Sequence, residues 1–163
     1  MRKVLFFFAV LGLAGSLWAA DPFIGTWKLN VTKSKARPGT SLPKEQTDVC
    51  RELDTNQIEC ATKSIKADGS ASTLTISFPR QGGMVKLQPP SPKYLSYVET
   101  IVKPGEWYAT FMMNGVQIQL IHKVIGEDGK TARATITGVG LDGKPYEEIL
   151  VGERQKLERE CFY

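Results

Sequence analysis

Few side chains in this sequence are arranged for catalysis. His122 is the only histidine, so a metal site would need cysteine or carboxylate ligands, and no clustered spacing provides them. A Ser–His–acid triad through His122 is formally possible, but no nucleophile-elbow motif accompanies it. Glu147 and Glu148 are adjacent on an expected strand and point to opposite faces, so they cannot form an acid–base pair. We therefore expect a protein that is not an enzyme, without metal or cofactor. A polar cleft that holds His122 beside a carboxylate would favour an enzyme.

The three cysteines, Cys50, Cys60 and Cys161, allow one disulfide and one remaining thiol. A reactive cysteine is disfavoured because no nearby histidine is evident to lower a thiol pKa. Cys50 and Cys60 are the preferred pair. The alternatives are that all three are reduced, or that Cys161 pairs with one of the other two.

The preference for Cys50 and Cys60 comes from the hairpin expected around residues 54–56. A three-residue loop there places Leu53 opposite Gln57, and the ladder then places Cys50 opposite Cys60. Opposed residues on antiparallel strands have Cα atoms roughly 4.5–5.5 Å apart, which suits a disulfide. A four-residue loop would shift the register by one residue and lose the match.

The first twenty residues have the layout of a cleaved signal peptide. Arg2 and Lys3 precede an apolar run from Val4 to Leu13, and small residues follow up to Ala19 and Ala20, either of which can precede the cut. The run is shorter than the roughly 20 residues needed to cross a bilayer. We expect a signal peptide at 1–20, one domain at 21–163 and export to the periplasm or the extracellular space. No integral membrane segment is expected after cleavage.

The charge balance argues against nucleic acid as a partner. The whole sequence carries 21 basic and 17 acidic residues. Removal of the leader takes away Arg2 and Lys3 and leaves 19 basic and 17 acidic residues, a net charge of +2. A nearly neutral chain provides no electrostatic attraction for nucleic acid or an anionic membrane surface. The sequence does not indicate an oligomeric state.

Hydrophobic residues alternate with polar ones along most of the mature chain, as in half-buried strands. Two-residue turn signals such as Asn114-Gly115 and Asp128-Gly129 separate these segments. The pattern predicts an all-β fold, an antiparallel up-and-down barrel of roughly 8–10 strands. Strands are expected at 26–31, 45–53, 57–66, 71–79, 94–103, 106–113, 116–125, 131–138 and 145–154, with a short addition at 84–87.

The segment from Phe23 to Asn30 contains Gly25-Thr26-Trp27 and resembles the first strand of the calycin superfamily, which includes lipocalins and intracellular fatty-acid-binding proteins. More narrowly, the mature chain is similar to a group of small secreted proteins of soil bacteria with a lipocalin-like domain. This similarity is carried by residues 21–35 and 126–151. The resemblance implies a lipocalin-like barrel.

The resemblance also implies a structural plug at one end of the barrel. In lipocalins an Arg from the last strand stacks across the first-strand Trp, a contact of roughly 0.5–2 kcal/mol. Trp27 and Arg154 are the implied pair, and we expect them to touch no ligand. The chain departs from fatty-acid-binding proteins because the Gly- and Pro-containing segment 32–44 cannot form their helical lid. Their Arg–x–Tyr carboxylate pattern is also not found near the C-terminus.

The densest cluster of aromatic residues and methionines lies at 107–113. Alternation in this hairpin predicts an inward face that would line an apolar cavity, since eight-stranded barrels can hold one small ligand. The candidates are Trp107, Phe111, Met113, Val116, Ile118, Leu120 and His122. The sequence therefore predicts an exported barrel that binds a small apolar or amphipathic molecule. The alternative is a non-catalytic envelope or interaction protein whose barrel is filled with side chains.

Overall fold

The structure, a computed structural model, describes residues 21–54, 56–88, 96–140 and 142–156. The expected signal peptide and Cys161 lie outside the described residues. Within them the chain forms eleven strands and a single-turn 3-10 helix, η1 (Val31–Lys33). The strands are β1 (Gly25–Leu29), β2 (Glu45–Asp54), β3 (Gln57–Ile65), β4 (Ala71–Pro79), β5 (Gly83–Met84), β6 (Lys86–Gln88), β7 (Ser96–Lys103), β8 (Glu106–Met113), β9 (Val116–Ile125), β10 (Thr131–Val139) and β11 (Pro145–Arg154). All nine expected long strands are present, with ends shifted by no more than two residues.

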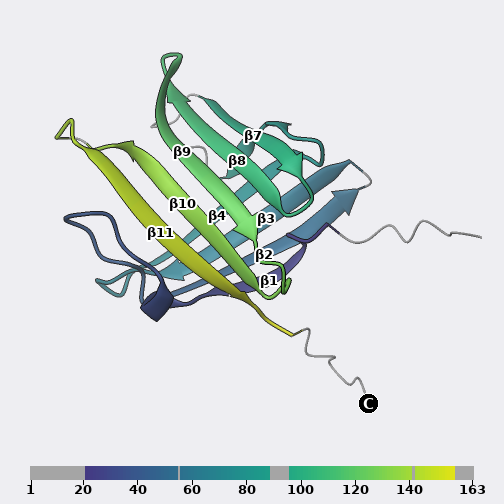
Figure 1. Ribbon diagram of the computed structural model, residues 1–163, viewed down its shortest axis with the longest axis horizontal. Helices are drawn as coiled ribbons and strands as arrows, with labels where there is room; N and C mark the ends of the chain where they lie inside the picture. Colours follow the sequence, from purple (N-terminus) through teal and green to yellow (C-terminus); the bar gives the residue numbers. More distant parts are fainter. Residues whose placement is uncertain (1–20, 55, 89–95, 141, 157–163) are drawn as a thin grey trace, which may run out of the picture.

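All these strands belong to one antiparallel sheet, in the order β5-β7-β8-β9-β10-β11-β1-β2-β3-β4-β6. Strands that are adjacent in space are mostly consecutive in the chain, and β1 joins the two halves by pairing with both β11 and β2. Figure 1 shows β9, β10 and β11 crossing over β2, β3 and β4, so the sheet curls over on itself. The expected all-β, antiparallel up-and-down barrel is confirmed.

One short segment forms both ends of the sheet. β5 pairs with β7 and β6 pairs with β4, and only Val85 separates the two short strands. The backbone N–H of Val85 also donates to the carbonyl of Tyr97 at 2.9 Å. Residues 83–88 are therefore hydrogen-bonded to β7 and to β4 in turn. This brings the two sheet edges together and leaves fewer unpaired edge groups than an open sheet would have.

Two turns depend on glycine. Asn114 and Gly115 have φ values of 51° and 77°, the double positive φ that a tight two-residue hairpin turn between β8 and β9 requires. Gly82 has φ of 86°, and a Cβ at this position would lie 2.6 Å from the carbonyl oxygen of Glu99. Only glycine therefore lets the chain pass this close to β7 just before residues 83–88, which we call the closing segment.

A disulfide joins Cys50 on β2 to Cys60 on β3, with Cα atoms 4.1 Å apart. The pairing is the one expected from the sequence, but the loop differs. Asp54 lies opposite Gln57, and Leu53 is an extra residue in a bulge. The loop is thus one residue shorter than expected and the strand one residue longer. These two differences cancel, so Cys50 still lies opposite Cys60.

Trp27 and Arg154 close one end of the barrel, as the lipocalin resemblance implies. They lie directly opposite each other on β1 and β11, with the guanidinium carbon 4.4 Å from the centroid of the indole ring. Trp27 is only 4% exposed, and its indole N–H donates to the carbonyl of Phe23 at 3.0 Å. The Arg154 guanidinium donates to the backbone carbonyls of Pro22, Ile24 and Gly129. This end of the barrel is therefore held by packing and by hydrogen bonds.

Candidate ligand-binding site

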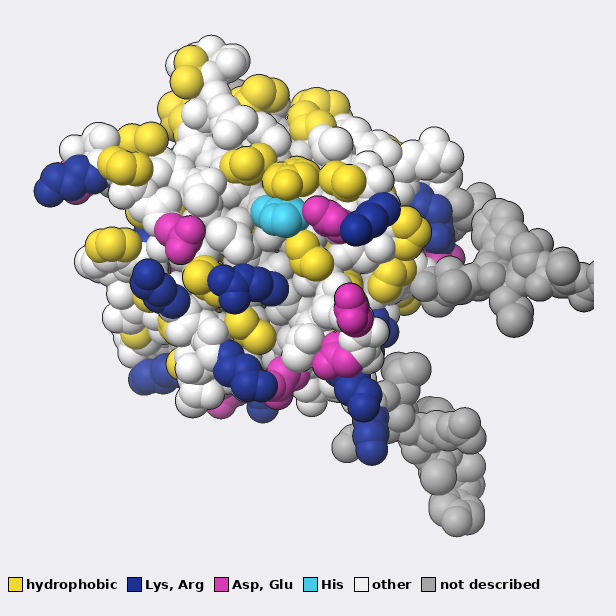
Figure 2. All heavy atoms as spheres, in the orientation of Figure 1, with side chains coloured by type: hydrophobic (Ala, Val, Ile, Leu, Met, Phe, Trp, Pro, Cys, Tyr) yellow, Lys and Arg dark blue, Asp and Glu magenta, His cyan; other side chains and the backbone are white. Residues whose placement is uncertain are grey.

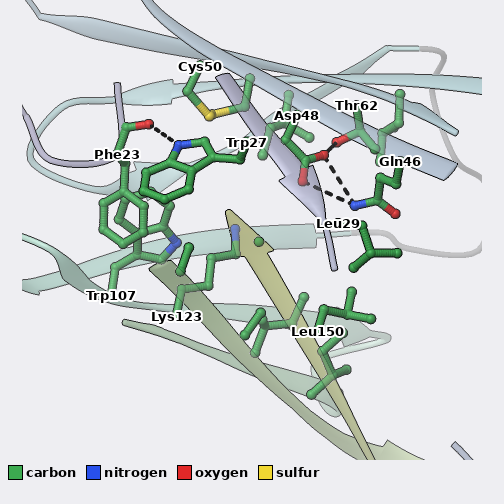
Figure 3. A pocket seen from close by; sticks show the side chains of 18 of the residues that line it. Phe23, Trp27, Leu29, Gln46, Asp48, Cys50, Thr62, Trp107, Lys123 and Leu150 are labelled. Carbon is green, nitrogen blue, oxygen red and sulfur yellow. Dashed lines mark hydrogen bonds between the residues drawn. A yellow bond between two sulfur atoms is a disulfide. The ribbon is translucent and has the colours of Figure 1, made fainter. Parts of the chain in front are cut away.

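The barrel interior contains a cavity of about 260 Å³. Trp27, Trp107 and the Cys50–Cys60 disulfide form its wall near the closed end, and Figure 3 shows the side chains converging on it from opposite sides of the barrel. Trp27 was expected to touch no ligand, but it lines this cavity, whereas Arg154 does not. The apolar lining also includes Leu29, Leu74, Ile76, Phe111, Ile121, Ala134, Ile136 and Leu150. Small side chains on β10 and β11, such as Ala134 and Gly152, leave much of this space open.

A bulge in β9 changes which of its residues face this cavity. Phe111 lies opposite Gln119, whereas the next residue, Met112, lies opposite Gln117. Ile118 is therefore an extra residue on β9, and the register shifts by one at this point. Because side chains alternate between the two faces of a strand, one extra residue exchanges the inner and outer positions that follow it.

Because of this bulge, the residues of β9 that face the cavity differ from those expected. Ile121 and Lys123 line the cavity in place of Leu120 and His122, which lie on the outer face of β9. Of the seven expected residues, the structure places two, Trp107 and Phe111, in the cavity wall. The residues it places elsewhere are Met113, Val116, Ile118, Leu120 and His122. Val116 is 65% exposed beside the Asn114-Gly115 turn.

His122 lies beside a carboxylate, but outside the barrel. Its Nε2 is 2.9 Å from Glu106 Oε1, and its ring stacks on Tyr108 with centroids 4.4 Å apart. The hydrogen bond with His122, together with Lys103, lowers the pKa of Glu106. Figure 2 shows the histidine on the outer surface next to an acidic side chain and surrounded by hydrophobic ones. Among the described residues no hydroxyl or thiol is hydrogen-bonded to His122, so the pair has no partner positioned as a nucleophile.

One polar group in the cavity wall is centred on Asp48. Its Oδ1 accepts a hydrogen bond from the Thr62 hydroxyl at 2.6 Å, and its two carboxylate oxygens lie 3.3 and 3.1 Å from Gln46 Nε2. Figure 3 shows this group on the same side of the cavity as the disulfide. Sequence reasoning missed these residues, although a signal existed: Asp48 is two residues from Cys50, and Thr62 is two residues from Cys60. An inward-facing disulfide therefore places both side chains inside.

A second polar group surrounds Lys123 on the opposite wall. Lys123 lies directly opposite Trp107, with its ammonium nitrogen 5.0 Å from the centroid of the indole ring and 3.4 Å from Glu99 Oε1. Glu99 is only 1% exposed, and its Oε1 also accepts a hydrogen bond from the Tyr97 hydroxyl at 2.5 Å. Burial, and then the charge of Glu99, raise the pKa of Tyr97 well above its usual value.

Two buried side-chain atoms have no hydrogen-bond partner within the part of the chain that the structure describes: Trp107 Nε1 and Glu99 Oε2. Both belong to the group around Lys123. Buried polar atoms are paired in the great majority of native structures, so an unpaired donor in a cavity wall indicates a place for an acceptor from outside the chain.

The other end of the barrel carries residues from the loop after η1. The guanidinium carbon of Arg37 lies 5.0 Å from the centroid of the Tyr146 ring, and the Tyr146 hydroxyl donates to Gln119 at 3.3 Å. A β-bridge between Lys35 and Ile149 fixes the start of this loop on β11. Burial raises the pKa of Glu148, and the nearby charge of Arg37 opposes that shift. In the described segment between β1 and β2 the single turn η1 is the only helical element, so no helical lid forms there.

The described residues contain no group of three or more His, Cys, Asp or Glu side chains placed to hold a metal ion. Nor does this part of the chain form a helix long and apolar enough to span a membrane.

Comparison with solved structures identifies the class of fold. A point mutant of the fluorescent protein UnaG superposes with a TM-score of 0.56 at 12% sequence identity, covering 85% of this chain and 99% of UnaG. The S-type phycobiliprotein lyase CPES from Guillardia theta gives a TM-score of 0.57 at 10% identity, covering 83% of this chain and 89% of CPES. Wild-type UnaG gives 0.52 at 11% identity, covering 84% and 100%. No protein-family model and no curated protein sequence matches the chain.

These similarities show that the chain has a lipocalin-like β-barrel fold. At this level of identity they establish the fold alone. The same barrel carries different functions in different proteins, so the fold does not by itself establish a function.

Proposed function

We propose that the protein is an exported barrel that binds a small, mainly apolar molecule in its central cavity. The observation that carries this proposal is the cavity of about 260 Å³ with its largely apolar wall. An apolar protein cavity of about 150 Å³ is enough to bind benzene, and typical ligand pockets measure about 300–1,000 Å³. The cavity therefore fits a compact molecule of two or three aromatic rings.

The cavity also weighs against the alternative of a barrel filled with side chains. Protein interiors are normally packed as densely as organic crystals, and voids much larger than a water molecule are few. Here small residues such as Ala134 and Gly152 occupy inward positions where larger side chains would fill the space. The location of the His122–Glu106 pair on the outer face, away from the cavity, favours binding over catalysis as the function of the cavity.

Export to the periplasm or the extracellular space is part of the proposal. It is supported by the basic start, apolar run and small residues within positions 1–20. The Cys50–Cys60 disulfide also supports it, since disulfides persist mainly in oxidising compartments. Signal cleavage is tested by the N-terminal sequence of the protein recovered from outside the cytoplasm, expected to begin at residue 20 or 21.

The binding function is tested with phenylnaphthylamine, an uncharged apolar dye whose emission rises when it leaves water. Mature protein, stripped of bound lipid, is expected to increase the emission saturably with one site per chain. Native mass spectrometry of unstripped protein is expected to show a bound guest of small mass. A dye titration without any saturable response, together with a guest-free mass spectrum, would show that the cavity does not bind apolar molecules.

A further inference from the structure

Trp107 holds an unpaired hydrogen-bond donor at the wall of the cavity. The residue is only 3% exposed, and its Nε1 has no acceptor among the described residues. The contrast with the other tryptophan of the cavity wall is clear, because the indole N–H of Trp27 donates to the carbonyl of Phe23 at 3.0 Å. Leaving a buried N–H unpaired is unfavourable, and an acceptor atom of a bound molecule would remove that cost.

Lys123 brings further donors to the same place. Its ammonium group has three N–H bonds, and within the described residues its one hydrogen bond is the 3.4 Å contact with Glu99 Oε1. Figure 3 shows Lys123 reaching into the cavity beside Trp107, with the indole nitrogen on the side of the ring that faces Lys123. A guest that packs beside Trp107 therefore also lies near the Lys123 ammonium group, which is 5.0 Å from the centroid of the indole ring.

The charges around the cavity oppose an anionic guest. Lys123 is already paired with Glu99, which is fully buried, and Asp48 places a second carboxylate in the wall. Arg133 also borders the cavity, but it is exposed, so water screens its charge. Asp48 therefore brings a negative charge to the cavity wall, while the charge of Lys123 is offset by Glu99. A third negative charge would be repelled in a partly desolvated site.

Resting on the proposed function, we infer that the molecule held in the cavity is uncharged and presents a carbonyl-type acceptor to Trp107 Nε1 and Lys123 Nζ. Its apolar body packs against the side chains of Phe111, Ile121 and Leu150. Asp48, across the cavity and separated from β9 by β10, β11 and β1, can accept a hydrogen bond from a donor at the far end of the molecule. The ligand class is therefore a compact ketone, lactone or amide, and not a carboxylate.

Three naphthalene derivatives of nearly equal size test this assignment: naphthyl methyl ketone, ethylnaphthalene and naphthoate, each substituted at the same ring position. Their affinities for mature wild-type protein are measured by equilibrium dialysis. The ketone is expected to bind about tenfold more tightly than ethylnaphthalene, as one or two added hydrogen bonds would give. Naphthoate is expected to bind more weakly than the ketone. A ketone that binds no better than ethylnaphthalene, or naphthoate binding best, would overturn the inference.

Two variants test which side chains donate hydrogen bonds to the acceptor of the guest. Trp107→Phe removes the N–H and keeps an aromatic ring, and Lys123→Met removes the ammonium and keeps the length of the chain. Each is expected to reduce the preference for the ketone over ethylnaphthalene severalfold. Tyr108→Phe is the matched control on the outer face of β8 and should preserve the preference. An unchanged preference in both cavity variants would contradict the assignment, and either variant alone is informative if the other does not fold.

The same series separates this inference from the proposal on which it rests. Ethylnaphthalene reports the apolar cavity without any acceptor. If none of the three compounds binds, the binding function itself is wrong. If ethylnaphthalene binds and the ketone gains nothing, the cavity binds apolar molecules but the assignment to Trp107 and Lys123 is wrong.

Discussion

Arg154 lies directly opposite Trp27 on the neighbouring strand, and its guanidinium stacks on the indole ring while donating hydrogen bonds to three backbone carbonyls. The accepting carbonyls belong to Pro22 and Ile24, before β1, and to Gly129, in the turn before β10. One side chain near the end of the described chain thus fixes its beginning and an intervening turn. The contact stabilises the end of the barrel where Trp27 forms part of the cavity wall.

Arg154→Leu should destabilise the fold substantially. The substitution leaves partly buried carbonyls without a donor and removes the cation–π contact, which predicts a loss of about 2–4 kcal/mol in the free energy of unfolding. Urea denaturation followed by tryptophan fluorescence measures it. Arg51→Leu is the control, because the side chain of Arg51 is 66% exposed and its ion pair with Glu59 should contribute less than about 1 kcal/mol. Equal losses in the two variants would show that Arg154 has no special role.

Reduction of the disulfide should lower stability by a smaller, calculable amount. The bond links residues separated by ten positions in sequence, and the loop-entropy relation gives about 2–3 kcal/mol for a loop of that length. The comparison is between the Cys50→Ala/Cys60→Ala double variant and wild type in chemical denaturation. Cys161→Ser, outside the described residues, should leave stability and its sensitivity to reductant unchanged. Loss of the sensitivity to reductant in Cys161→Ser would show that Cys161 belongs to the bonded pair.

Glu148 should make stability fall as the pH rises. Burial raises its pKa in the folded state, so the folded protein binds more protons than the unfolded chain between the two pKa values. Stability is therefore lost as the pH rises from the unfolded value of about 4.5 through the raised pKa. Glu148→Gln removes this loss and should be more stable than wild type at neutral pH, with the difference shrinking at about pH 4. The exposed neighbour variant Glu147→Gln should not show this trend, and a constant difference for Glu148→Gln across the range would contradict it.

The bulge at Ile118 predicts which residues of β9 can be reached from solvent. In a Cys161→Ser background, His122→Cys should react rapidly with a bulky thiol reagent because the position is on the outer face. Ile121→Cys should react much more slowly because it faces the cavity. The reaction is followed by mass spectrometry under native conditions. The reverse order of reactivity would show that residue 122 faces the cavity and residue 121 faces solvent, as uninterrupted alternation predicts.

Much of the fold could be predicted because its determinants are local. Alternation and Asn-Gly or Asp-Gly turns define the long strands. The expected pairing of Cys50 with Cys60 is also found, although it holds because the shorter loop and the bulge at Leu53 cancel. The Trp27–Arg154 contact followed from a resemblance confined to the first strand. The closing segment was foreseen only as a short strand, because its role depends on two partners distant in sequence, β4 and β7.

The cavity wall was predicted less well, for a specific physical reason. A β-bulge adds one residue without changing the apolar character of the strand, so Val116-Gln117-Ile118-Gln119-Leu120 reads as uninterrupted alternation. The extra residue turns Ile121 toward the cavity and places His122, the only histidine in the sequence, on the outer face. The polar residues Asp48 and Lys123 were overlooked because a charged side chain on a strand usually faces solvent.

The central claim is that the interior of this barrel is a binding site, and a pair of neighbouring substitutions on β10 tests it most directly. Ala134→Phe places a ring inside the cavity, whereas Thr135→Phe places the same ring on the outer face opposite His122. The dissociation constant of phenylnaphthylamine is measured for both, after thermal denaturation has shown that they are folded. We predict that Ala134→Phe weakens binding at least about tenfold and that Thr135→Phe changes it by less than about twofold. Equal affinity in the two variants, or a loss confined to Thr135→Phe, would contradict the account.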